Sequence, residues 1–187
     1  ARLLVVGGGH VGLAVATLGE LCGMSVAIFD DREEFANAER FPMAEQVFAG
    51  DTAAALDAFG IGGSDYIVLV SRGHQLDELA LRHTVGTGAA YVGMIGSRRR
   101  TQTVLEHLRD SGIDAAVLDA VRTPIGIDIG AETPEWRSFT TILVRPFLAS
   151  FAILKASLAR RFASAAADQP AGPHAGATAP GSGRVAR

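Results

Sequence analysis

An apolar run that ends in three consecutive glycines is the feature that most constrains how this chain can fold. Residues 2–17 read RLLVVGGGHVGLAVAT, in which a short β-branched run meets the glycines and is followed by small residues at helical spacing. The run has the length and composition of a buried parallel strand, and the residues after the loop predict a helix that lies on a sheet. A strand, a glycine loop and a helix in this order begin a nucleotide-binding βαβ unit.

The loop fits the spacing G-x-G-x-x-G at Gly7, Gly9 and Gly12. We expect Gly7 to allow a tight turn, Gly9 to let a ligand phosphate approach the backbone, and Gly12 to let the helix pack on the strand. The start of the helix, which includes His10, would then attract an anion. The alternative interpretation is a glycine-rich turn that serves helix packing alone.

Two carboxylates follow the next apolar run, which predicts a second strand over residues 25–30. Asp30 ends this run eighteen residues after Gly12, and Asp31 follows it. A carboxylate at this place commonly accepts hydrogen bonds from ribose hydroxyls. Both acids are therefore candidate site residues, and their alternative role is to cap the next turn.

Strands and helices alternate through the rest of the first 112 residues. The patterns predict strands over residues 45–50, 65–71 and 89–96, and helices over residues 51–59, 74–85 and 98–112. Residues 113–121 fit one more short helix. This alternation predicts an α/β fold of the Rossmann-like, doubly wound type, with a mainly parallel sheet and helices on both faces.

Polar residues gather where two of these strands end, in SRGHQLD and GSRRR. Because ligands of doubly wound sheets bind beyond the carboxyl ends of the strands, these stretches supply further candidates: Arg72, Gly73, His74, Gly96, Ser97 and Arg98. Neighbouring arginines on a helix point about 100° apart, so we expect one or two of the three to face a ligand. No nucleophile and base, and no metal ligands, stand at a recognisable spacing. We expect a binding crevice and not a reaction centre.

The motifs YVGMIGSRRR, SRGHQLDELALRH and TPIGIDIGAETPE, with VVGGGHVG and FDDR, resemble the C-terminal domain of the XdhC/CoxI family. These are accessory proteins for molybdenum-containing xanthine and carbon monoxide dehydrogenases, and the resemblance covers residues 2–135. It implies a chaperone that binds the molybdenum cofactor, as molybdopterin or its dinucleotide form, assists its sulfuration with a cysteine desulfurase and inserts it into the hydroxylase. His10 is not one of the family's motif positions. Those positions correspond here to Gly7, Gly9, Gly12, Asp30, Asp31, Arg72, Gly73, His74, Gly96, Ser97, Arg98, Pro124, Gly126 and Asp128.

Full-length members also carry an N-terminal domain with a cysteine that is thought to hold the cofactor, and this sequence does not include it. The sequence contains one cysteine, Cys22, within the first predicted helix, so it can build neither a disulfide framework nor a thiolate metal site.

Charge divides the chain at residue 135. Residues 1–135 hold 19 acidic and 10 basic residues, whereas residues 136–187 hold 1 acidic and 7 basic residues. We expect a Rossmann-like domain over residues 1–135, a divergent helical extension over 136–167 and a disordered tail over 168–187, which is rich in proline, glycine and alanine. The change of charge also fits a shifted reading frame.

The acidic domain argues against nucleic-acid binding. The apolar stretch over residues 139–159 is interrupted by Arg145, Pro146 and Lys155, so it lacks the roughly 18 uninterrupted apolar residues that a membrane span needs. The chain opens on its first strand without a basic and apolar leader, so we expect a cytoplasmic protein. The expected partner is a molybdenum hydroxylase such as xanthine dehydrogenase. The apolar helix of residues 147–162 would either pack on the domain or contact a second copy of the chain, and the sequence leaves both alternatives open. Two alternative functions stay open at this point, an NAD(P)-dependent oxidoreductase and a non-catalytic nucleotide-sensing module.

Overall fold

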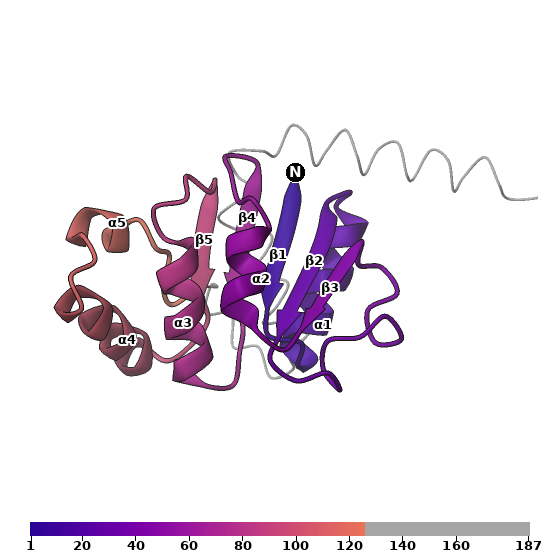
Figure 1. Ribbon diagram of the computed structural model, residues 1–187, viewed down its shortest axis with the longest axis horizontal. Helices are drawn as coiled ribbons and strands as arrows, with labels where there is room; N and C mark the ends of the chain where they lie inside the picture. The colour runs from indigo at the N-terminus through magenta and orange to yellow at the C-terminus, as the bar shows by residue number, and fades with distance from the viewer. Residues whose placement is uncertain (126–187) are drawn as a thin grey trace, which may run out of the picture.

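Five parallel strands form the centre of the part of the chain that the structure, a computed structural model, describes, which is residues 1–125 (Figure 1). The strands are β1 (Arg2–Val6), β2 (Ser25–Asp30), β3 (Gln46–Ala49), β4 (Asp65–Leu69) and β5 (Tyr91–Met94). They lie in the order β3-β2-β1-β4-β5, so the direction of winding reverses between β1 and β4. The predicted Rossmann-like, doubly wound parallel sheet is confirmed.

Some predictions lie outside the described residues. They are Gly126 and Asp128 as site residues, the domain end at residue 135, the extension over 136–167 with its apolar helix, and the tail over 168–187. The side chain of His74 is also outside the description. All of these stay predictions.

Helices cover both faces of the sheet. They are α1 (His10–Leu21), α2 (Thr52–Ala58), α3 (His74–Thr84), α4 (Arg98–Asp110) and α5 (Ala115–Asp119). Each lies within a predicted helix. Side-chain caps explain where three of them begin. Asp51 accepts a hydrogen bond from the Ala54 N–H at 3.0 Å, Ser97 accepts one from the Arg100 N–H at 3.3 Å, and Asp114 accepts one from the Ala116 N–H at 2.7 Å.

The strands alternate between two hydrophobic cores, since successive side chains point to opposite faces. In β1, Leu3 and Val5 pack toward α1, whereas Leu4 and Val6 pack toward α2 and α3 on the other face. The helix α4 packs on the outer side of α3, away from α1 (Figure 1). Both faces of the sheet are therefore buried.

The register of the sheet aligns the ends of its three central strands. Val6 pairs with Phe29 of β2 on one side and with Leu69 of β4 on the other. The loops that follow β1, β2 and β4 therefore leave the sheet side by side at its carboxyl edge. This edge is the place where the polar residues of the predicted site belong.

Candidate functional site

The first two glycines of the loop after β1 are engaged with the protein itself. The Gly7 N–H donates to the Phe29 carbonyl oxygen at 2.7 Å, and its φ of 115° is one that favours glycine. The Gly8 N–H donates to Asp30 Oδ2 at 2.7 Å, and a Cβ at Gly8 would overlap the Phe35 carbonyl oxygen. These two residues shape the loop.

The start of α1 is open. Gly9 is the N-cap of α1, no side chain caps this end, and a Cβ built on Gly9 would meet no atom within 4 Å. The first helical hydrogen bond runs from the Leu13 N–H to the Gly9 carbonyl oxygen at 2.9 Å. The N–H groups of residues 9–12 consequently have no hydrogen-bond acceptor in the described part of the chain. Such a helix start attracts anions.

Asp30 holds the glycine loop in place through buried hydrogen bonds. Its side chain is 0% exposed, and besides Gly8 it accepts hydrogen bonds from the Arg32 backbone N–H at 3.0 Å and from Arg32 Nε at 2.9 Å. Burial opposes ionisation, but the hydrogen bonds from Arg32 and Gly8 outweigh it, so the pKa of Asp30 is lowered. Asp31 differs, because its side chain is 60% exposed.

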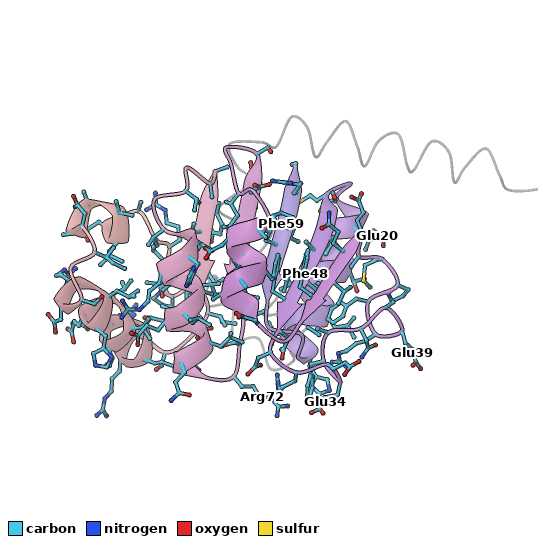
Figure 2. All side chains as sticks on the ribbon, viewed as in Figure 1. Glu20, Glu34, Glu39, Phe48, Phe59 and Arg72 are labelled. Carbon is cyan, nitrogen blue, oxygen red and sulfur yellow. The ribbon has the colours of Figure 1, made fainter. Side chains whose placement is uncertain are left out.

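The loop between β2 and β3 brings cations to the glycine loop. Arg40 Nε donates to the Gly8 carbonyl oxygen at 2.8 Å, and Arg40 Nη2 is buried with no hydrogen-bond partner. The guanidinium carbons of Arg32, Arg40 and Arg72 lie 3.9, 5.4 and 5.8 Å from the centre of the Phe35 ring. We call these four residues the Phe35 cluster. Figure 2 shows Arg72 at the edge of the sheet where the strands end.

A buried carboxylate anchors the turn after β4. Asp77, in the first turn of α3, is 0% exposed. Its Oδ1 lies 2.6 Å from the Ser71 hydroxyl, and its Oδ2 accepts a hydrogen bond from Arg100 Nη2 at 2.6 Å. Burial raises the pKa of Asp77, although the Ser71 hydroxyl and the Arg100 guanidinium oppose that shift. Arg100 Nη1 also donates to the Arg72 carbonyl oxygen at 3.3 Å, so α4 holds the turn in place.

Known proteins resemble this chain over most of the described domain. The profile of the XdhC Rossmann domain matches residues 3–137. The chain belongs to this family. The uncharacterised protein YqeB of Escherichia coli strain K12 is 34% identical over 135 residues, which are 72% of this chain and 25% of that protein. A probable xanthine dehydrogenase subunit from Bacillus subtilis strain 168 is 27% identical over 134 residues, which are 72% of this chain and 38% of that one.

A solved structure shows the same fold. The crystal structure of a xanthine dehydrogenase from Bacillus halodurans superposes with a TM-score of 0.66 at 23% identity, over 83% of this chain and 43% of that chain. The chain therefore spans about a quarter to two fifths of the length of the proteins it matches.

The structure brings most of the predicted residues of this XdhC Rossmann domain to one edge, although their contact with a ligand stays a prediction. Gly7, Gly9, His10, Gly12, Asp30 and Asp31 follow β1 and β2, and Arg72, Gly73 and His74 follow β4. His10 is exposed in the first turn of α1, and Gly73 is the N-cap of α3. Gly12 packs against the Gly7 carbonyl oxygen, as the close approach of helix and strand requires. Both oxygens of the buried Asp30 have protein partners. Asp31 lies 3.6 Å from Arg32 Nε but is 60% exposed, so it is the more accessible of the two carboxylates.

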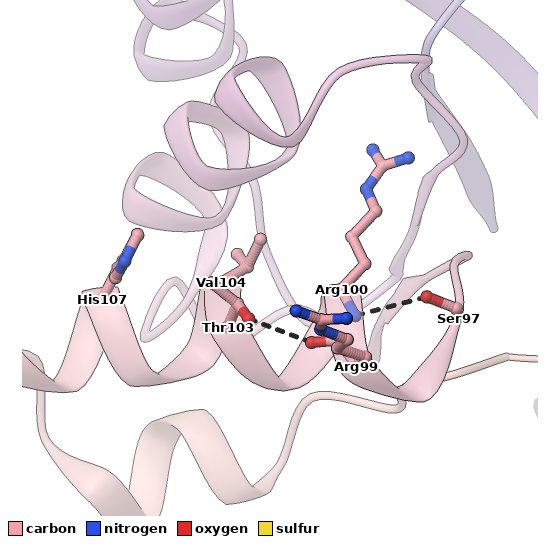
Figure 3. Close-up of a pocket in the computed structure, with 6 residues that line it drawn as sticks. All are labelled: Ser97, Arg99, Arg100, Thr103, Val104 and His107. Atoms are coloured by element: carbon pink, nitrogen blue, oxygen red, sulfur yellow. Dashed lines mark hydrogen bonds between the residues drawn. The ribbon is translucent and has the colours of Figure 1, made fainter.

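The GSRRR stretch of the XdhC domain follows β5 at the same carboxyl edge, and Arg100 connects it to the turn after β4. Ser97 caps α4 by accepting a hydrogen bond from the Arg100 N–H at 3.3 Å, and Arg98 and Arg99 are exposed. A hollow of about 310 Å³ lies along α4. Figure 3 shows the residues that line it: Ser97, Arg99, Arg100, Thr103, Val104 and His107. Of these residues, Arg100 alone also contacts the turn after β4. Pro124 is exposed and follows Thr123, whose hydroxyl donates to the Met94 carbonyl oxygen at 3.3 Å.

Sequence reasoning missed four contributors to this edge: Phe35, Arg40, Asp77 and Arg100 as the partner of Asp77. The acid after Gly73 in SRGHQLD was one available signal, since a carboxylate in the first turn of a helix that follows a strand end lies close to the loop. Within residues 1–125, no three His, Cys, Asp or Glu side chains are grouped so that they could hold a metal ion. None of the helices of this same part combines the length and apolar character that crossing a membrane requires.

The lowered pKa of Asp30 predicts an acid-sensitive fold. Because this pKa lies below that of the unfolded chain, near 3.8, Asp30 contributes stability that is fully present above pH 3.8 and is lost as the pH falls through the folded-state pKa. We expect the free energy of unfolding, measured with urea by circular dichroism, to fall between about pH 4 and pH 2. Asp30→Asn should flatten this fall, whereas Asp31→Asn should not. An equally steep fall in Asp30→Asn would contradict the assignment.

Proposed function

We propose that this XdhC Rossmann domain binds the molybdenum cofactor by a phosphate group held at the start of α1, and that it serves the maturation of a molybdenum hydroxylase of the xanthine dehydrogenase type. The observation that carries the proposal is the open start of α1 at Gly9, where the N–H groups have no acceptor among residues 1–125 and a Cβ on Gly9 would meet no atom within 4 Å. A phosphate fits both properties, since it is anionic and needs close approach to the backbone.

The matched proteins support a role connected with xanthine dehydrogenase. One matched protein is named a probable xanthine dehydrogenase subunit, and the matched crystal structure is that of a xanthine dehydrogenase. Membership in the XdhC family points the same way. An accessory role beside such an enzyme accommodates both facts, and it does not require a catalytic set of residues in this domain.

The chain's own residues take separate tasks in this proposal. The N–H groups of Gly9, His10 and Val11 hold a phosphate, and Asp31 accepts hydrogen bonds from hydroxyl groups of the ligand. Cys22 lies just beyond the far end of α1, twelve residues long and so about 18 Å from its start. Cys22 is therefore too far from the start of α1 to deliver sulfur to a ligand bound there, and in this proposal a cysteine desulfurase supplies the sulfur.

The same glycine loop also suits a nicotinamide dinucleotide. NAD(P) is therefore the alternative ligand whose binding should be compared with that of the molybdenum cofactor. A dehydrogenase would place a proton donor or acceptor beside the nicotinamide ring. The two acids that are buried at this edge are both occupied, Asp30 by Gly8 and Arg32 and Asp77 by Ser71 and Arg100. This favours binding and delivery of a cofactor over hydride transfer.

Gly9→Ala tests the proposal, because its methyl group would occupy the place of the phosphate without touching the protein. We expect binding of purified molybdenum cofactor, followed by its absorbance after gel filtration, to weaken about tenfold or more, a loss of roughly 1.4 kcal/mol or more. Its free energy of unfolding should change by no more than about 1 kcal/mol. Activation of a co-expressed xanthine dehydrogenase should fall in parallel.

The matched control is Gly62→Ala, which also adds a methyl group in open space but before β4, at the opposite edge of the sheet. It should bind the cofactor as the unmodified chain does. Tight binding of NADPH in place of the molybdenum cofactor, or cofactor binding that is indifferent to Gly9→Ala, would refute the proposal.

A further inference from the structure

We infer that Arg40 and Arg72 form a second phosphate subsite beside the glycine loop, so that the site prefers a ligand with a diphosphate bridge to one with a single phosphate. The inference rests on the proposed function and names its ligand class more closely, as a nucleoside diphosphate derivative such as the dinucleotide form of the cofactor. The start of α1 holds one phosphate, and the two guanidinium groups hold the next.

Arg40 places a donor directly beside the first subsite. Its Nε is fixed by the Gly8 carbonyl oxygen at 2.8 Å, one residue before the open Gly9. Its Nη2 is buried and has no partner, although guanidinium nitrogens that are removed from water are nearly always hydrogen-bonded. The Arg40 side chain as a whole is half-buried and forms no ion pair with a described acid, so an anion bound next to Gly8 and Gly9 would compensate its charge.

Arg72 approaches from the other side of the loop. It follows β4, whereas Arg40 follows β2, and β1 with its glycine loop lies between these two strands. Both guanidinium carbons nevertheless lie within 6 Å of the Phe35 ring centre, at 5.4 Å for Arg40 and 5.8 Å for Arg72. The pair therefore spans the switch point of the sheet, where ligands of this fold bind.

Charge separates these two arginines from the third member of the Phe35 cluster. Arg32 is neutralised by the buried Asp30 at 2.9 Å, and Asp31 and Glu34 also raise its pKa. In contrast, neither Arg40 nor Arg72 forms an ion pair with any described residue. Arg72 is exposed, so it can turn toward a ligand at little cost.

Two neighbouring subsites select the chemistry of the ligand. The phosphates of a diphosphate share a bridging oxygen, so a ligand held at Gly9 by one of them brings the other to Gly8 and Arg40. Guanidinium groups bind phosphate through paired, charge-assisted hydrogen bonds, which are stronger than neutral ones. A ligand with two linked phosphates can engage the N–H groups and the arginines through separate phosphates, so we expect it to bind more tightly than a ligand with one phosphate.

The test compares inorganic pyrophosphate with orthophosphate by isothermal titration calorimetry on the full chain. We expect the unmodified chain to bind pyrophosphate at least about tenfold more tightly. Arg72→Gln and Arg40→Gln should each lower this preference to about threefold or less. Arg109→Gln, an exposed change in the last turn of α4, should leave the preference unchanged. Because Arg72 is exposed, its variant reports on binding even if Arg40→Gln disturbs the loop.

Equal affinity for the two anions, no binding of either anion, or a preference that survives Arg72→Gln would overturn the inference. These results differ from a failure of the proposed function. If the chain binds the molybdenum cofactor in a manner that depends on Gly9 but shows no preference for pyrophosphate, the second subsite alone is refuted. If the arginine-dependent preference is present and the cofactor does not bind, the subsite stands and its proposed ligand is wrong.

Discussion

Replacement of Arg100 by methionine should lower the free energy of unfolding by about 3 kcal/mol. Asp77 is fully buried, and the Arg100 guanidinium, at 2.6 Å, is the cation that compensates its charge. Methionine keeps much of the apolar stem of arginine but leaves the carboxylate buried with Ser71 as its remaining partner among the described residues. The loss is large because an uncompensated charge is far more costly in the protein interior than in water.

The neighbouring Arg99→Met is the matched control for this experiment. Arg99 is exposed and has no ion pair among the described residues, so its replacement should change stability by less than about 0.5 kcal/mol. Urea unfolding of both variants, followed by circular dichroism, measures the difference. The double variant Asp77→Asn with Arg100→Met should recover part of the loss. If Arg100→Met is as stable as Arg99→Met, the buried ion pair does not anchor the turn after β4.

The second large effect is expected for Gly12→Ala, which should lower the free energy of unfolding by about 2 to 3 kcal/mol. A Cβ at Gly12 would overlap the Gly7 carbonyl oxygen, and this atom belongs to backbone that cannot rotate away. The same change in the interior of an unconstrained helix stabilises it by about 1 kcal/mol. The sign of the effect is therefore diagnostic of the close approach between α1 and the loop.

Thermal and urea unfolding measure this change, with Gly9→Ala as the control from the same loop. A Cβ at Gly9 would meet open space, whereas a Cβ at Gly12 would overlap the Gly7 carbonyl oxygen. Gly9→Ala should therefore weaken ligand binding while leaving stability nearly unchanged. Gly12→Ala should lose both, since the displaced loop no longer presents its N–H groups. A stability of Gly12→Ala equal to or above that of the unmodified chain would contradict the packing described for the loop.

The fold could be predicted because its signals are local. The apolar run before Gly7, the acid that caps α2 and the glycine after α4 each act on residues close to them in the chain. Asp51 does cap α2, and Gly112 has the positive φ of 93° that ends a helix. The predicted strands over residues 65–71 and 89–96 were too long, since β4 ends at Leu69 and β5 covers Tyr91–Met94. The sequence pattern shows which residues are apolar, but it does not show where the hydrogen bonding between neighbouring strands ends.

The candidate site could be predicted only in part, because its contacts join residues that are distant in sequence. The place of Asp30 at the end of β2 was evident, but its burial depends on Arg32 and on Gly8, twenty-two residues earlier. The pairing of Asp77 with Arg100 spans twenty-three residues. A run of three arginines shows that a cation is available without showing which one faces inward, and that choice is made by tertiary packing.

The contacts that hold Gly8 in place affect the thermodynamics of ligand binding. Its N–H is held by Asp30, its carbonyl oxygen by Arg40, and its Cα lies against the Phe35 backbone. A glycine loses more conformational entropy on becoming ordered than any other residue. Here that loss accompanies folding, before any ligand arrives. A ligand thus meets a loop that is already ordered, and its affinity is not reduced by the cost of ordering one.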